Sequence, residues 1–234
     1  MGAGTSGRLG VLDASEIPPT YNASPELVQG FIAGGDIALR KAIEGAEDFP
    51  EDGARLVREI GVTPKDVVMG IATSGVTPYV LGSLEEARSI GAKTVFFTCV
   101  NPTDVSIDVD VLIAPQVGAE VITGSTRMKA GTATKLVLNM ITTTAMIKMG
   151  KVFENLMVDL KATNNKLTDR ARRIIASITD CSYEEAIDLL DQSNKFVKVA
   201  LVMKEAGVGP DQAQEYLDRY AGNVREAISE LEKE

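Results

Sequence analysis

Two kinds of side chain in this 234-residue sequence could do chemistry together: hydroxyl groups beside glycines, and glutamates at the ends of predicted helices. A hydroxyl group and the free amides at a helix N-terminus suit a dianionic phosphate, and the helix dipole adds about 0.3–1 kcal/mol. The hydroxyl residues occupy three loops, at Thr5, Ser6, Ser74, Thr77, Ser125 and Thr126. A role as helix caps alone is the alternative, but the repetition of the pattern favours a phosphate site.

The glutamates lie where two predicted helices end. Glu16 follows the first helix and precedes two prolines, which stiffen the backbone. Glu44 and Glu47 flank a glycine at the end of a second helix. A carboxylate at a helix C-terminus is mildly unfavourable, which indicates a purpose other than helix stability. Isolated glutamates are usually solvated surface residues, and the residues alone leave that alternative open.

Basic side chains accompany the third hydroxyl loop. Arg127, Lys129 and Lys135 follow Ser125 closely in the sequence. They are either part of a solvated face or neutralise an anionic substrate, and the pattern does not decide between the two.

The composition narrows the chemistry. Histidine is absent, which removes the usual zinc sites, the Ser–His and Cys–His nucleophile systems and imidazole acid–base catalysis. Proton transfer would therefore fall to Glu, Asp, Lys or Tyr. Cys99 and Cys181 have no metal-ligand spacing and make no disulfide framework, and Cys99 lies in an apolar run where we expect it to be buried. We expect neither a metal nor a cofactor.

The charge balance disfavours two classes of partner. The formal net charge is −9 and the pI about 4.7, so nucleic acid and anionic membrane surfaces would be repelled. Aromatic residues make up 5% of the chain and tryptophan is absent, which leaves few platforms for stacking bases. No apolar run reaches the roughly 18 residues of a membrane span, and no signal segment precedes the chain, so we expect a cytoplasmic protein.

The hydrophobic pattern predicts an α/β fold. Residues 66–72 and 94–100 are predominantly apolar, 109–114 form a shorter run, and an amphipathic helix at 79–90 separates the first two. We also predict a strand at 27–33 and helices at 9–15, 36–44 and 54–60. Such strands form a parallel sheet covered by helices on both faces, with ligands at the carboxyl ends of the strands.

The second half of the chain is predicted to be helical. A long helix reaches about residue 149, and short amphipathic segments follow at 168–178, 182–192, 197–205 and 210–220, with a last one from 223. We therefore predict a sugar-phosphate domain at residues 1–165 and a small helical subdomain at residues 166–234.

Several long motifs together resemble one family. They are residues 2–10 (GAGTSGRLG), 12–16 (LDASE), 18–21 (PPTY), 33–35 (AGG), 44–48 (EGAED), 72–79 (ATSGVTPY), 117–120 (VGAE), 124–132 (GSTRMKAGT), 150–153 (GKVF) and 162–164 (ATN). The whole chain resembles the N-acetylmuramic acid 6-phosphate etherases of the sugar isomerase (SIS) superfamily, which are similar to the glucokinase regulatory protein.

The resemblance implies a bacterial, cytoplasmic homodimer that recycles cell-wall amino sugars. Its reaction would be a lyase reaction, in which N-acetylmuramic acid 6-phosphate and water give N-acetylglucosamine 6-phosphate and D-lactate. Carried over by motif, Glu16 would be the acid that assists lactate departure and Glu47 the base at C2. Thr5, Ser6, Ser74, Thr77, Ser125, Thr126 and Lys129 would hold the phosphate and the sugar hydroxyls.

One departure from the family pattern has a structural consequence. Members carry a helical segment and a first central strand before the glycine-rich loop, and this sequence begins at the loop. We expect the sheet to be open there, with unpaired backbone, and the chain to be less stable.

Two other functions share part of this pattern. A sugar-phosphate isomerase of the same superfamily would have the same phosphate loops, although the motif at 14–19 (ASEIPP) argues against it. A sugar-phosphate sensor without catalytic activity is the other alternative.

Overall fold

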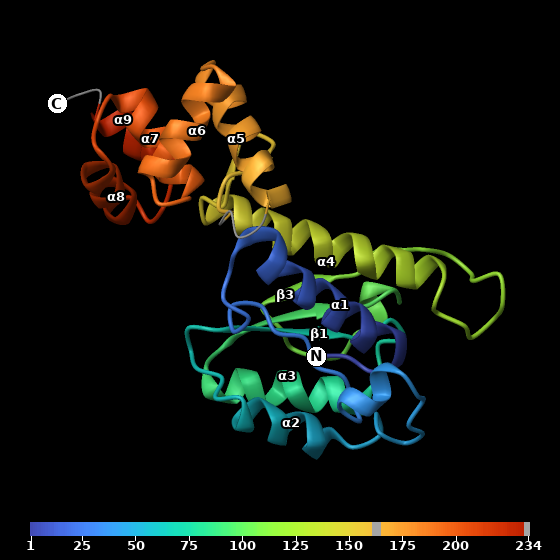
Figure 1. Cartoon of the computed structure of the whole chain (residues 1–234). Helices are drawn as coiled ribbons and strands as arrows, with labels where there is room; N and C mark the ends of the chain where they lie inside the picture. Colours follow the sequence, from blue (N-terminus) through green and yellow to red (C-terminus); the bar gives the residue numbers. More distant parts are fainter. Residues whose placement is uncertain (161–164, 232–234) are drawn as a thin grey trace. The chain divides into compact units, whose positions relative to one another are not determined.

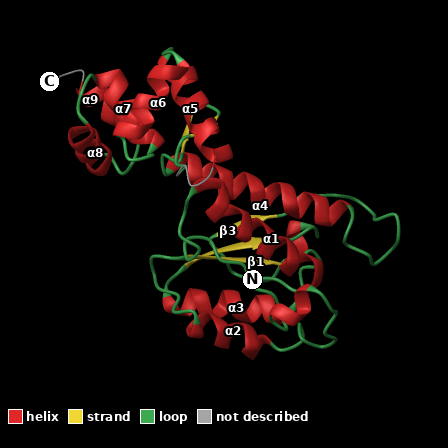
Figure 2. Cartoon of the chain, viewed as in Figure 1, coloured by secondary structure: helices red, strands yellow, loops and turns green. Residues whose placement is uncertain are grey.

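Three parallel strands form the main sheet, in the order β1-β2-β3 (Figure 2). They are β1 (Val67–Ile71), β2 (Lys93–Phe97) and β3 (Val111–Ile113). β-branched and aromatic residues dominate these segments, as expected of buried parallel strands. The predicted α/β class is confirmed.

The computed structural model describes residues 1–160 and 165–231, so the motif at 162–164 lies outside the described residues. The chain divides into two compact units. The first consists of Met1–Glu16 and Pro25–Met140, and the second of Ile17–Ser24 and Ile141–Glu234. The predicted boundary at residue 165 stays a prediction.

The first residues of the chain extend the sheet beyond β1. Gly2 forms parallel bridges to both Ile32 and Ile71. The Gly2 amide donates to the Phe31 carbonyl oxygen at 3.1 Å, and the Ile71 amide donates to the Met1 carbonyl oxygen at 2.9 Å. The spatial order is therefore Ile32, Gly2, β1, β2, β3. The expectation of an unpaired β1 edge is wrong at its carboxyl end, because Met1 and Gly2 pair with it.

The predicted strand at 27–33 is wrong for most of its length. Only Ile32 pairs, as an isolated bridge to Gly2, and residues 25–28 form turns. The physical reason is that a strand needs a partner along its whole length. The segment Met1–Ala3 offers one for only a few residues.

Helices cover both faces of the sheet in the first unit. Figure 1 shows α2 (Pro50–Glu59) and α3 (Pro78–Ile90) on one face, and α1 (Gly4–Tyr21) with the beginning of α4 (Lys129–Lys148) on the other. Successive side chains of β2 point to opposite faces. Phe96 packs with residues of α2 and α3, and Phe97 packs with Leu138 of α4. The sheet is the middle of three layers, so the prediction that helices cover both of its faces is confirmed.

Two early helices differ from their predictions. α1 continues through Pro18 and Pro19 to Tyr21, although proline lacks the amide hydrogen of the helix bond and usually ends a helix. The predicted helix at 36–44 is only the 3₁₀ turn η1 (Asp36–Leu39). The Arg8 guanidinium donates to the carbonyl oxygens of Ala38 and Leu39 at 2.6 and 3.0 Å, so these groups are already occupied and do not propagate a helix. A second 3₁₀ turn, η2, spans Pro102–Asp104.

α2 and α3 approach each other at two glycines. A Cβ atom on Gly53 would lie 2.0 Å from the Tyr79 carbonyl oxygen, and one on Gly82 would lie 2.1 Å from the Pro50 carbonyl oxygen. Neither contact leaves room for a side chain. The glycine pair therefore sets how close the first turn of α2 lies to the first turns of α3.

Replacing Gly82 with alanine should lower the free energy of unfolding of the first unit by about 1–3 kcal/mol, because the methyl group overlaps backbone atoms of Pro50. Gly10→Ala is the matched control. Its Cβ would meet only the end of the Ile71 side chain at 3.4 Å, and alanine favours the helix by about 0.5–1 kcal/mol. Urea unfolding of both variants checks this. Equal effects of the two substitutions would contradict the packing argument.

The second unit is mainly helical. Its helices are α5 (Asn165–Thr179), α6 (Tyr183–Gln192), α7 (Val197–Ala206), α8 (Pro210–Arg219) and α9 (Val224–Leu231). The predicted helical segments are confirmed within a few residues. Helix α7 is at the centre of the core, where residues 199–203 are all buried.

A short hairpin precedes these helices and was not predicted. It consists of β4 (Val152–Phe153) and β5 (Leu156–Met157), which pair antiparallel. Asp159 follows the hairpin and accepts ion pairs from Lys151 at 2.7 Å and Lys198 at 2.9 Å. These ion pairs fasten the hairpin to α7. Among the described residues, no helix is long and apolar enough to cross a membrane.

Candidate active site

The parallel sheet brings several loops to one edge. Gly2, Ile32 and β1 run in the same direction, so the segments that follow them leave at the same edge as those after β2 and β3. From Gly2 the chain passes through α1 and returns to the sheet at Ile32, on one side of Gly2, whereas from β1 it passes through α3 to β2, on the other side. The two helices lie on opposite faces of the sheet (Figure 1). Ligands of open α/β sheets bind at such a switch point. It lies between the start of α1 and the β1–α3 loop.

Thr5 and Ser6 lie in the first turn of α1, directly after the Gly2 bridge. Ser6 is buried, with 8% of its surface exposed, and Thr5 is half-buried. A Cβ on Gly2 would lie 2.8 Å from the Gly7 nitrogen, so the chain turns into the helix too tightly for a side chain there. This turn directs the amides at the start of α1 toward the carboxyl edge of the sheet.

Ser74 and Thr77 lie in the β1–α3 loop, on the other side of the switch point. The Gly75 amide donates to the Ala72 carbonyl oxygen at 2.9 Å, and the φ angle of Gly75 is 81°, a conformation that favours glycine. Thr77 is the N-cap of α3, yet its side chain makes no capping hydrogen bond. A role as a helix cap therefore does not explain the Thr77 hydroxyl. Ser74 is exposed to solvent at the tip of the loop.

Ser125, Thr126 and Lys129 lie at the start of α4. The position of a Cβ on Gly131, in the first turn of this helix, is 3.6 Å from the Thr126 carbonyl oxygen and 3.7 Å from the Thr5 methyl carbon. The Thr5 side chain therefore lies near Gly131, as the Thr126 backbone does, although Thr5 is far from both in the sequence. The Lys129 ammonium donates to the Ala119 carbonyl oxygen at 2.9 Å, and Ser125 is half-buried.

The two glutamates belong to different elements. Glu16 is exposed and lies within α1, not after it as predicted, ten residues from Ser6 or about 15 Å along the helix axis. Glu47 is exposed in the turn before α2, and its carbonyl oxygen accepts a hydrogen bond from the Tyr79 amide at 3.0 Å. The backbone of Glu47 is therefore fixed to the first turn of α3, which carries Thr77.

Glu120 lies in the motif at 117–120 but was not among the predicted site residues. Its carboxylate accepts hydrogen bonds from the backbone amides of Lys129 and Ala130 at 3.1 and 3.0 Å. These bonds hold the pKa of the Glu120 carboxyl below its usual range. Caps are recognised in sequence within three residues of a helix start, and Glu120 is nine residues away. The residues around the start of α4 therefore do not predict this cap.

Cys99 follows β2 and is only half-buried, so the prediction of a buried cysteine is not met in full. Partial burial, and then the charge of Glu120, raise the pKa of the Cys99 thiol. Glu120 therefore lies near the carboxyl end of β2 as well as at the start of α4.

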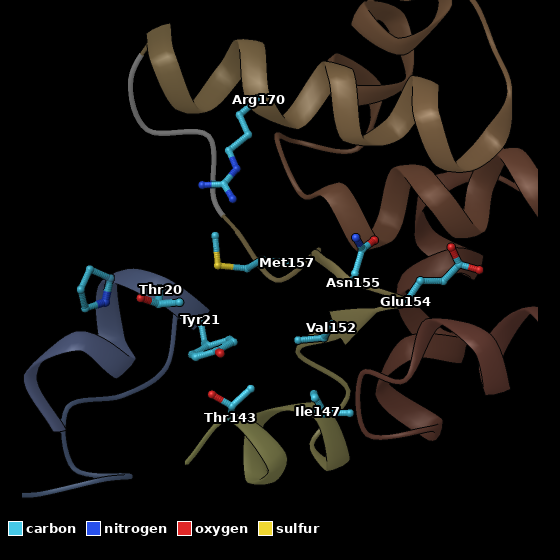
Figure 3. A pocket seen from close by; sticks show the side chains of 10 residues that line it. Thr20, Tyr21, Thr143, Ile147, Val152, Glu154, Asn155, Met157 and Arg170 are labelled. Carbon is cyan, nitrogen blue, oxygen red and sulfur yellow. The ribbon is translucent and has the colours of Figure 1, made fainter. Parts of the chain in front are cut away.

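The second unit contains a separate pocket of about 550 Å³ (Figure 3). Figure 3 shows Arg170 of α5 extending toward Met157, with Thr20, Tyr21 and Thr143 on the other side. None of the predicted site residues lines this pocket. It is not the site that the hydroxyl loops predict.

Two family models match the chain. Residues 1–88 match the N-terminal SIS domain of the glucokinase regulatory protein, and residues 154–193 match the C-terminal lid domain of the same protein. The first match covers both loops of the switch point together with Glu16 and Glu47.

Curated relatives match nearly the whole chain. The N-acetylmuramic acid 6-phosphate etherase of Salinibacter ruber is 54% identical over 97% of this chain and 74% of its own length. The etherase of Rhizobium rhizogenes is 52% identical over 98% of this chain and 75% of its own length. The etherase of Clostridioides difficile is 51% identical over 100% of this chain and 77% of its own length. With half of its residues identical along its whole length, the chain belongs to the N-acetylmuramic acid 6-phosphate etherase family.

Proposed function

We propose that this chain is a carbon–oxygen lyase that cleaves the D-lactyl ether of N-acetylmuramic acid 6-phosphate and releases N-acetylglucosamine 6-phosphate and D-lactate. The observation that carries the proposal is the 54% identity to a curated etherase over 97% of the chain. The hydroxyl loops on both sides of the switch point support it, because they suit a phosphorylated sugar.

The proposed reaction is an elimination followed by addition of water. Opening of the sugar gives a C1 aldehyde, and the lactyl ether at C3 is then β to that carbonyl. A base removes the C2 proton, the resulting enolate expels lactate, and water adds to C3 of the unsaturated aldehyde. The lactate alkoxide is a poor leaving group, so an acid must donate a proton to it. Two carboxyl groups in unequal environments can divide these roles.

The two glutamates take these roles in the proposal. Glu47 would remove the C2 proton, and Glu16 would donate a proton to the departing lactate. Because Glu16 lies about 15 Å along α1 from Ser6, the ring-opened sugar would extend along this helix. The other hydroxyl groups and Lys129 would contact the phosphate and the sugar.

Incubation with N-acetylmuramic acid 6-phosphate tests the function. Release of D-lactate supports the lyase reaction, formation of a ketose phosphate supports the isomerase alternative, and binding without turnover supports the sensor. An enzymatic assay for D-lactate and mass spectrometry of the sugar distinguish the three.

The phosphate loop can be tested by adding a charge. Ser74→Asp should raise KM by about 10- to 100-fold and change kcat little, because the new carboxylate repels the phosphate of the substrate. Ser74 is exposed, so the fold should tolerate the substitution. Ser89→Asp is the control, since it adds the same charge at an exposed position near the other end of α3. An unchanged KM for Ser74→Asp would remove this loop from the site.

We also propose a homodimer in the bacterial cytoplasm. Leu136 and Met140 lie one turn apart on α4 and are 52% and 59% exposed, which supports burial against a second copy. Light scattering of the purified chain measures its mass in solution, and a monomer at micromolar concentration would contradict this part of the proposal.

A further inference from the structure

The Glu120 carboxylate attaches the loop between β3 and α4 to the helix. Glu120 accepts hydrogen bonds from the first two amides of α4, those of Lys129 and Ala130, at 3.1 and 3.0 Å. The first amides of a helix have no partner within the helix and carry the positive end of its dipole. A side chain of this protein therefore takes the position in which an anion would bind to α4.

Among the described residues, the other side-chain attachments of this loop are those of Gln116, whose amide donates to the Val100 carbonyl oxygen at 3.0 Å, and of Lys129. Val121 and Ile122 are 73% and 66% exposed, so their side chains do not anchor it in the core. Gly118 and Gly124 have φ angles of 70° and 83°, which few other residues adopt. The Lys129 ammonium donates to the Ala119 carbonyl oxygen at 2.9 Å, next to the bonds of Glu120. The part of the loop after Gln116 is therefore attached to α4 through Glu120 and Lys129.

The loop carries residues of the proposed site. Ser125 and Thr126 follow Glu120 within six residues, and the Thr126 carbonyl oxygen lies against Gly131 beside Thr5. The charge of the Glu120 carboxylate also acts on Cys99, which follows β2. The carboxylate therefore lies between the carboxyl edge of the sheet and the loop that faces the start of α1.

We propose that Glu120 is a positioning residue: it closes the N-terminus of α4 to anions and holds Ser125 and Thr126 against the start of α1. The phosphate of the substrate is then left to the loops at Thr5–Ser6 and Ser74–Thr77. This inference rests on the proposed function for its effect on turnover, but the attachment itself can be measured without turnover.

The test uses the full chain with Glu120→Ala and the isosteric Glu120→Gln. Hydrogen exchange of the Lys129 and Ala130 amides should be about tenfold faster or more in Glu120→Ala, because these amides lose their acceptor. The kcat/KM for D-lactate release should fall by about 10- to 100-fold, as expected when substrate contacts are misplaced by about 1 Å. Glu85→Ala, an exposed carboxylate on α3, is the control for loss of a charge.

Chemical rescue separates positioning from general damage to the fold. Sodium acetate supplies a carboxylate that can occupy the vacated N-terminus of α4, so it should restore slow exchange and part of the lost turnover in Glu120→Ala. Sodium chloride at the same concentration should not. Glu120→Gln keeps an acceptor oxygen and should lie between wild type and Glu120→Ala.

The outcomes distinguish the two proposals. Unchanged amide exchange in Glu120→Ala overturns the attachment, and faster exchange with unchanged turnover overturns the positioning role. Loss of turnover that acetate does not restore also overturns it. If the unaltered chain releases no lactate, the proposed function fails, and the exchange measurement still decides whether Glu120 holds the loop.

Discussion

Glu47→Gln should reduce the rate of D-lactate release by a factor of about 10²–10⁴, because a general base contributes that much to proton removal. Glutamine has nearly the same shape but does not accept the C2 proton. Glu47 is exposed, so the substitution should leave stability within about 0.5 kcal/mol of wild type. Exchange of the substrate C2 proton with solvent deuterium should fall by the same factor, since the same group performs it.

Glu44→Gln is the matched control for this experiment. Glu44 is also exposed, three residues earlier, and is on the other side of Gly45. Its backbone has no bond to α3 like the one that the Tyr79 amide makes to Glu47. The control should keep full turnover. Equal losses in both variants would mean that the turn as a whole matters and that Glu47 has no chemical role.

Glu16→Gln should also reduce lactate release by about 10²–10⁴-fold, but for a different reason. Glutamine does not donate an acidic proton to the lactate oxygen, so the C3–O bond breaks slowly. Removal of the C2 proton precedes that step and should continue. We therefore expect deuterium to enter C2 of the unreacted substrate in Glu16→Gln, as followed by NMR in deuterium oxide.

The pair of variants also assigns the roles. If Glu16→Gln stops C2 exchange and Glu47→Gln does not, the acid and the base are interchanged. If either variant turns over at the wild-type rate, the corresponding glutamate is not part of the mechanism.

The α/β unit and the second-unit helices could be predicted because their signals are local. β1 is apolar throughout and β2 ends in the apolar run 95–97, while Gly91 and Gly207 end α3 and α7 with φ angles of 93° and 66°. A glycine in this conformation is a strong stop signal within one turn of the helix. Such signals need no knowledge of the rest of the fold.

The errors fall where a distant partner decides the structure. The segment before Ala33 has the composition of a strand, but it pairs only where Gly2 is available. The predicted helix after Asp36 is limited to one turn because Arg8, about thirty residues earlier, occupies its carbonyl groups. Nothing near these segments in the sequence reveals either partner.

Local signals and distant partners also differ in what they predict about the candidate site. The positions of the hydroxyl loops at helix starts were predictable, since each loop combines glycine with Ser or Thr. The contact of Thr5 and Thr126 with Gly131 follows from the packing of α1 beside α4, which the sequence does not specify. Glu120 was missed because its bond to α4 spans nine residues.

The fate of the ether oxygen tests the central claim most directly. The reaction is run in water enriched in ¹⁸O, and both products are analysed by mass spectrometry. Elimination and addition predict that the label enters the C3 hydroxyl of N-acetylglucosamine 6-phosphate and that D-lactate keeps the original ether oxygen. Label in the lactate hydroxyl group, with none at C3 of the sugar, would mean that the other bond of the ether is cleaved and would contradict the lyase mechanism.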